Sequence, residues 1–158
     1  SKEAIAAFDP HNSPIADCEP KGMTWLMEQP YPVEFVEADG EILFHLEEYD
    51  SVRTIYMNGQ LPQSDEHSLL GHSNGRWEGG SLVVTTTQIN YPYFNSSGLT
   101  QSEAIELLEH FTPSADGRRL DYTVVVSDPA MFTEPVTLDK AWIWRPGEEV
   151  KPYECARS

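Results

Sequence analysis

Single charged side chains on otherwise apolar strand faces are the first candidates for chemistry in this sequence. Glu109 shares one alternating strand face with the apolar residues Leu107 and Phe111. If that face points inward, burial disfavours the charged carboxylate and suits Glu109 to general acid or base catalysis. The neighbouring His110 lies on the other face and is the second candidate base, because histidine is the side chain most often used as a general base.

The same pattern recurs on other segments of alternating sequence. Asp128 continues an apolar face, which makes it the third candidate for general acid or base catalysis. Arg53 also lies on an apolar face and could hold an anionic group of a ligand. A structural role remains open, in which Arg53 forms an interior ion pair with Glu109 or Glu48 that fixes the register of the strands.

Aromatic side chains on the strands and on the long loop 90–101 form a second group of candidates. Inside a barrel they would line a cavity and offer hydroxyl or indole donors to a bound molecule, with the loop as a lid. Ordinary core packing is the alternative, and Trp77 could plug the closed end of a barrel. Together with Arg53, the candidate ligand-binding residues are Tyr56, Trp77, Tyr93, Tyr122 and Trp142.

Signatures of metal, nucleophile and cofactor sites are absent from the sequence. None of the five histidines has the spacing of a zinc site, although His45 and His110 lie on strand patterns that could converge. The segment 71–75, Gly-His-Ser-Asn-Gly, imitates a nucleophile elbow but lacks the strand before it and the helix after it. No phosphate-binding loop or dinucleotide fingerprint occurs, so we predict no metal and no cofactor.

Strand patterns recur at the spacing typical of barrels and sandwiches once the chain has passed residue 32. Helix propensity alone would make residues 102–112 a helix, but their hairpin-like neighbours favour a strand. Residues 60–75 are expected to be a polar loop. The predicted strands are 33–37, 41–49, 52–57, 81–89, 102–112, 119–127, 136–145 and 151–155.

About eight antiparallel strands in up-and-down order predict an all-β fold, a closed β-barrel of the lipocalin or calycin kind, with a sandwich as the alternative. At 158 residues the chain is most simply one domain. Residues 1–32, which are rich in proline and poor in periodicity, are expected to form an irregular N-terminal arm packed on the barrel domain 33–158.

The charge and cysteine content limit the partners and the compartment. A formal net charge of −16 argues against nucleic-acid or anionic-membrane partners, and no apolar run is long enough to insert into a membrane. Cys18 and Cys155 lie near opposite ends, and we predict a disulfide between them, which implies an oxidising compartment. Two buried free thiols are the alternative. The chain begins at Ser1, so a leader could have been removed, and an oligomer remains possible.

Six ordered motifs carry a resemblance to a known group. They are Cys18-Glu-Pro-Lys-Gly22, Pro30-Tyr-Pro-Val-Glu-Phe35, Glu48-Tyr-Asp-Ser-Val-Arg-Thr-Ile55, Gly75-Arg-Trp-Glu-Gly-Gly-Ser-Leu-Val-Val84, Thr133-Glu-Pro135 and Tyr153-Glu-Cys155. Over residues 18–155 the chain resembles a widespread family of exported, mostly uncharacterised bacterial proteins with a Gly-Arg-Trp-Glu-Gly signature. The chain departs from the family's pattern at Gly80, where an acidic residue is more usual. The resemblance implies a periplasmic or secreted β-barrel protein and no particular reaction.

Three functions are compatible with these observations. We expect an exported β-barrel protein that binds a small, largely apolar molecule in its interior. The first alternative is a cofactor-free isomerase, cyclase or lyase that uses a buried carboxylate or histidine in the same cavity. The second is a structural module that binds a partner protein.

Overall fold

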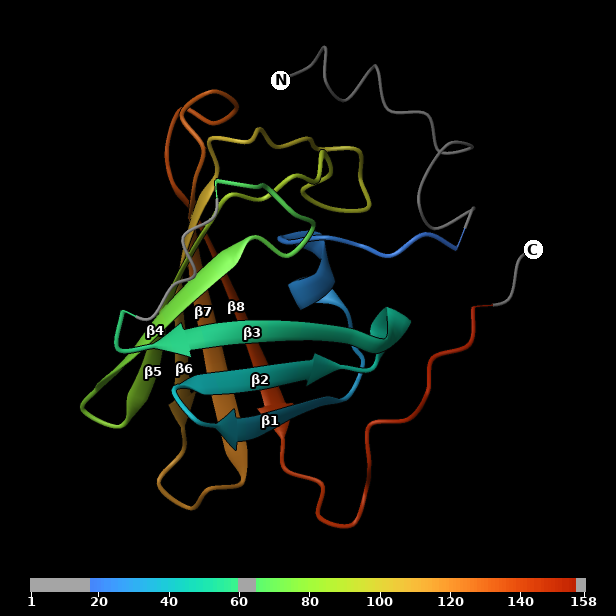
Figure 1. Cartoon of the computed structure of the whole chain (residues 1–158), viewed down its shortest axis with the longest axis vertical. Helices are drawn as coiled ribbons and strands as arrows, with labels where there is room; N and C mark the ends of the chain where they lie inside the picture. Colours follow the sequence, from blue (N-terminus) through green and yellow to red (C-terminus); the bar gives the residue numbers. More distant parts are fainter. Residues whose placement is uncertain (1–17, 60–64, 156–158) are drawn as a thin grey trace.

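The structure of the chain is a computed structural model that describes residues 18–59 and 65–155. All its strands belong to one sheet, whose spatial order follows the sequence (Figure 1). The all-β prediction is therefore confirmed. The strands are β1 (Val33–Ala38), β2 (Glu41–Leu46), β3 (Ser51–Met57), β4 (His72–Glu78), β5 (Ser81–Thr87), β6 (Glu106–Pro113), β7 (Arg119–Ser127) and β8 (Val136–Ile143).

The segment that helix propensity made ambiguous is the strand β6. It pairs antiparallel with β5 and with β7, so that Glu109 lies between Val84 and Val124. Neighbours on both sides satisfy the backbone N–H and C=O groups of β6, which outweighs the helix propensity of its glutamate and leucine residues. The strand prediction for 102–112 is confirmed for most of its length.

The strand β4 departs from the expected loop 60–75, whose residues 60–64 lie outside the described part of the chain. It carries only one large apolar residue, Trp77, so its sequence is typical of a turn. It becomes a strand because β3 and β5 pair with it on either side. The ladder between β3 and β4 is parallel, whereas every other neighbouring pair is antiparallel.

The prediction of a last strand over residues 151–155 is wrong, because these residues form no strand. The predicted number of about eight strands is nevertheless correct, since the unexpected β4 replaces the missing last strand.

The prediction of a closed barrel is wrong. The sheet curls through 219° and forms a half-barrel. Among the described strands β1 pairs with β2 alone and β8 with β7 alone, so two strand edges remain open. In Figure 1, β1–β3 cross in front of β6–β8. Aromatic rings fill the space between these two groups: Phe35 of β1 stacks on Phe44 of β2 at 4.4 Å and meets Phe111 of β6 edge-on at 5.4 Å.

The N-terminal arm completes the core of the half-barrel, and the C-terminal tail is linked to that arm. The arm, residues 18–32, contains the 3₁₀ helix η2 (Trp25–Glu28), in which Trp25, Leu26 and Met27 are buried. A second 3₁₀ helix, η3 (Glu48–Asp50), follows β2. The predicted disulfide between Cys18 and Cys155 is confirmed, and it joins the arm to the tail, residues 144–155. No described helix has the length and apolar character to cross a bilayer.

Candidate functional site

A buried polar network lies inside the curl of the sheet. The Arg53 guanidinium donates from Nη1 to Glu109 Oε1 at 2.9 Å, and from Nη2 to the other carboxylate oxygen. Tyr122 Oη donates to Glu109 at 2.7 Å, and Thr86 Oγ1 donates at 2.9 Å. Ser73 Oγ accepts from Arg53 Nε at 3.1 Å. Arg53 and Glu109 are 1% and 0% exposed, so the pair is closed to solvent.

Five strands supply this network, one inward-facing residue each, because strand alternation sends every second side chain into the curl. Burial alone would lower the pKa of Arg53, but the charge and hydrogen bonds of Glu109 outweigh it and raise that pKa. Burial and the Glu109 charge raise the pKa of Tyr122 well above its usual value. Arg53 therefore stays charged and Tyr122 stays a hydrogen-bond donor, which is the arrangement of an interior ion pair.

A second buried ion pair anchors the arm. Lys21 Nζ donates to Glu48 Oε1, and the two side chains are 7% and 2% exposed. The ammonium also lies 5.1 Å from the centre of the Trp25 ring. Burial raises the pKa of Glu48, and the interactions with Lys21 oppose that rise. The sequence indicated Glu48 as a possible partner of Arg53, but it did not indicate Lys21 of the arm as the actual partner.

The three candidate catalytic residues do not meet in one place. Glu109 points into the curl, whereas His110 points to the outer face of β6, in register with Val83 and Thr123. Asp128 is buried after the end of β7. Its carboxylate accepts the backbone N–H and the hydroxyl of Ser102, both at 2.6 Å, and thereby fixes the segment before β6.

The histidines do not converge either. His45 lies on β2 opposite the inward-facing Phe44 and Leu46, and His110 lies on the outer face of β6, with three strands between them in the sheet. Among the described residues, no group of three or more metal-ligating side chains could hold an ion.

The candidate ligand-binding residues are scattered. Arg53 and Tyr122 belong to the closed network, and Tyr56 is half-buried on the face of β3 opposite Arg53. Trp77 is 58% exposed near the β4–β5 turn and does not plug the interior. Tyr93 packs edge-on against Trp25, with ring centres 6.2 Å apart.

The remaining candidate, Trp142, lines a groove of about 540 Å³ at the open side of the half-barrel. We call this the seam groove. It exists because β1 and β8 do not pair, so the sheet leaves a gap between its first and last strands. Its lining comes from 30–35 before and at the start of β1, from 113 and 117–120 around the β6–β7 turn, from 142–145 at and beyond the end of β8, and from 148–150 of the tail.

The apolar part of the seam groove is unusually open to solvent. Trp144 is 66% exposed and Ile143 is 57% exposed, and both line the groove beside Trp142. Phe35 and Leu120 extend the apolar lining toward the core. Large apolar side chains gathered in a surface hollow mark binding sites more often than isolated exposed ones do.

Charged groups of both signs surround these apolar side chains. Arg118, Arg119 and Arg145 line the groove at the β6–β7 turn and after β8. Arg119 Nε donates to Asp121 at 2.7 Å, whereas the side chains of Arg118 and Arg145 contact no acidic group among the described residues. Glutamates also line the groove, at positions 34, 148 and 149.

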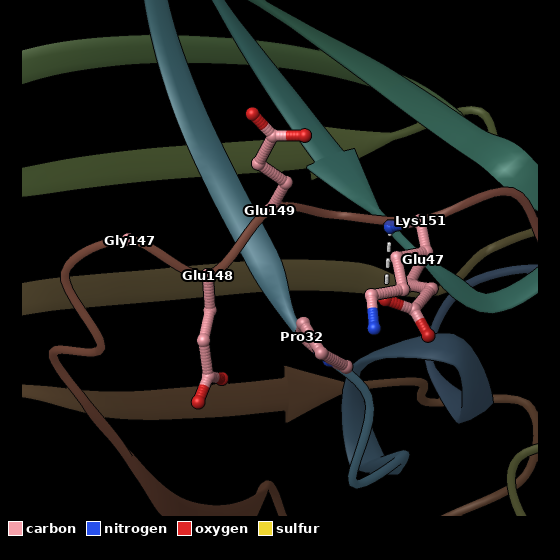
Figure 2. Close-up of a pocket in the computed structure, with 6 residues that line it drawn as sticks. All are labelled: Pro32, Glu47, Gly147, Glu148, Glu149 and Lys151. Atoms are coloured by element: carbon pink, nitrogen blue, oxygen red, sulfur yellow. Dashed lines mark hydrogen bonds between the residues drawn. The ribbon is translucent and has the colours of Figure 1, made fainter.

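A second hollow of about 480 Å³ lies along the same tail and shares Pro32, Glu148 and Glu149 with the seam groove (Figure 2). The Lys151 backbone N–H donates to Glu47 Oε2 at 3.1 Å and holds the tail against the end of β2. Tyr153 N–H donates to Asp50 at 3.0 Å. These contacts and the disulfide to Cys18 fix the tail, so they also fix one wall of the seam groove.

No protein-family model matches this sequence, and neither a curated protein nor a solved structure matches it significantly. The geometry of the chain itself therefore carries the functional argument.

Most residues of the seam groove are not among the candidates that the sequence indicates. The sequence predicts Trp144 and Arg145 as the end of the strand 136–145 and gives Arg118 no role. Two signals pointed there: a second tryptophan beyond the core-facing Trp142, and a pair of adjacent arginines in a strongly acidic chain. Neither could be placed beside 30–35 without knowing that β1 and β8 lie on the two sides of one gap.

Proposed function

We propose that this chain is an exported protein that binds a small, largely apolar molecule, and that the molecule lies in the seam groove. The observation that carries the proposal is the exposed apolar lining around Trp142, Trp144 and Ile143 in a hollow of about 540 Å³. This volume lies within the range typical of small-molecule sites, roughly 300–1,000 Å³.

The interior offers less support as a binding place. Phe44, Phe111, Ile55 and Val124 are each at most 2% exposed, and Glu109 fills the remaining polar centre. The Glu109 carboxylate already accepts hydrogen bonds from Arg53, and a substrate would have to displace them. The geometry therefore favours a structural role for the buried pair over acid–base catalysis.

Export is supported by the Cys18–Cys155 disulfide. Disulfides persist in oxidising compartments such as the bacterial periplasm or the extracellular space, and are rare in the cytosol. The periplasmic or secreted location is part of the proposal.

Binding of a neutral apolar probe tests the site directly. We expect N-phenyl-1-naphthylamine to bind the full chain with enhanced fluorescence, because its rings match the aromatic lining. Trp144→Ala should weaken this binding by about tenfold, since a buried aromatic contact contributes on the order of 1–3 kcal/mol. Trp77→Ala is the matched control, because Trp77 is also an exposed tryptophan but lies outside the groove.

Equal effects of the two substitutions, or the absence of probe binding, would count against the proposal. Mass spectrometry of molecules released from protein purified with its disulfide intact would identify the natural ligand class. Recovery of an apolar molecule from the wild type but not from Trp144→Ala would support the seam groove as its site.

A further inference from the structure

The cations of this chain fall into two groups by their partners. Most described lysines and arginines are occupied: Lys21 by Glu48, Arg53 by Glu109, Arg76 by Glu78, Arg119 by Asp121, and Lys140 by backbone carbonyls of the arm. The described lysines and arginines whose charged groups contact neither an acidic side chain nor a backbone carbonyl are Arg118, Arg145 and Lys151.

Two of these unpaired cations line the seam groove. The sequence contains 26 acidic residues against 10 basic ones, so an arginine in this chain has many possible partners. Unpaired acids are the expected state in such a chain, but unpaired arginines are not. Their position beside apolar side chains therefore suggests that their partner is a bound molecule.

The strand pairing places Arg118 beside the aromatic lining. Trp144 N–H donates to the Arg118 carbonyl at 2.8 Å, which continues the β7–β8 ladder beyond its last regular pair, Arg119 with Ile143. Leu120 lies opposite Trp142 in the same ladder. By alternation Arg118 and Trp144 share the face of Leu120 and Trp142, so an apolar surface ends at a guanidinium.

We propose that the ligand of the seam groove is a monoanionic amphiphile: a molecule with one carboxylate-like group and an apolar body. This inference rests on the proposed function and names the ligand class of that site. The anionic group would bind Arg118 and Arg145, because a guanidinium donates to a carboxylate through paired hydrogen bonds. The apolar body would lie against Trp142 and Trp144.

The glutamates of the groove would orient such a ligand. Glu148 and Glu149 project from the tail to either side near Pro32, as Figure 2 shows, and both line the seam groove. Negative charge at these positions repels an anionic group and leaves the guanidinium end of the apolar surface, at Arg118, as its favoured position. A molecule with two anionic groups would place one of them against the glutamates, so the class is limited to a single negative charge.

Three probes that share one alkyl chain and differ only in the charge of the head group test the charge preference. Dodecanoate, dodecanol and dodecylammonium, each below its aggregation concentration, are titrated into the disulfide-intact chain to displace N-phenyl-1-naphthylamine. We expect dodecanoate to bind about tenfold more tightly than dodecanol, as charge-assisted hydrogen bonds imply. The double variant R118Q/R145Q should lower dodecanoate affinity to that of dodecanol and leave dodecanol affinity unchanged.

The double variant R76Q/K151Q removes the same charge outside the seam groove and should leave all three affinities unchanged. The inference would be overturned if dodecanoate bound the wild type no more tightly than dodecanol does. It would also be overturned if dodecanoate bound R118Q/R145Q as tightly as it binds the wild type. Tightest binding of dodecylammonium would overturn it as well, since it would place the recognition at the glutamates. In each of these cases, binding of dodecanol would still support the proposed function. If none of the probes bound, both the proposed function and the inference about the ligand class would be overturned.

Discussion

Arg53 Nη1 lies 2.9 Å from Glu109 Oε1, although the two residues are 56 positions apart and belong to strands that are not neighbours in the sheet. The pair connects β3 with β6 through the inside of the curl. Both side chains must point inward for it to form, and a slip of one residue in either strand would turn one of them outward. The ion pair therefore links the register of the first strands to that of the last.

Removing one partner of this pair should be severely destabilising. Glu109→Gln leaves the charge of Arg53 buried without a counter-charge, and we expect a loss of about 3 kcal/mol in the free energy of unfolding. Urea denaturation measures it. In the exposed pair Arg76–Glu78, Glu78→Gln should cost at most about 1 kcal/mol. A similar small loss for Glu109→Gln would show that the buried pair contributes little.

Gly75, the first glycine of the Gly-Arg-Trp-Glu-Gly signature, should not accept a side chain. A Cβ atom there would lie 2.7 Å from Ile55 Cγ2 and 2.8 Å from Met57 Sδ. The Met57 side chain can move, but Ile55 Cγ2 moves only if the strand shifts or the β-branched side chain leaves its χ1 rotamer in a packed core. We expect Gly75→Ala to cost about 1–3 kcal/mol in chemical denaturation. If contact with Ile55 causes the loss, it should persist largely in a Met57→Ala background; full rescue there would assign the clash to Met57.

The disulfide should stabilise the chain and the groove together. Cys18 and Cys155 are 137 residues apart, so the link restricts almost the whole unfolded chain. The chain-entropy model gives about 5 kcal/mol for a loop of this size. We expect C18A/C155A to lose stability of this order in urea and to bind N-phenyl-1-naphthylamine more weakly, because the tail forms one wall of the groove. Wild-type protein reduced with dithiothreitol should behave in the same way, and unchanged binding after reduction would contradict the role given to the tail.

The stability of the chain should depend on the protonation of Glu28. Glu28 is exposed as a whole residue, but partial burial of its carboxyl group raises the pKa of Glu28 above its ordinary value of 4.5, and the nearby Lys140 charge opposes this only in part. The folded chain thus holds a proton that the unfolded chain has released. The stability from this group is present below the unfolded pKa and is lost as the pH rises through the folded pKa.

Glu28→Gln should therefore gain stability relative to the wild type as the pH rises from about 4 to about 7. Unfolding free energies of the two proteins at successive pH values give this difference. A difference that stays constant, or that changes in favour of the wild type, would show that the pKa of Glu28 is not raised by folding.

Periodicity predicted most strands because their buried faces are encoded locally. In β2 the buried residues Ile42, Phe44 and Leu46 alternate with less buried ones, and the sequence shows this directly. The strand β4 lacks such a pattern, since neighbouring strands rather than its own side chains make it a strand. The candidate site was missed for a related reason. Each of its walls is ordinary in sequence, and only their arrangement around one gap makes a groove.

The sequence by itself determined an all-β chain with inward-facing charges and two cysteines placed to join its ends. These properties follow from alternation and composition, which are local. Only the tertiary structure decided that the sheet stays open, that Arg53 meets Glu109 rather than Glu48, and that Trp144 lies beside Arg118 at the seam. Such outcomes depend on the curl of the sheet and the pairing of distant strands, whose energies depend on contacts between residues far apart in the chain.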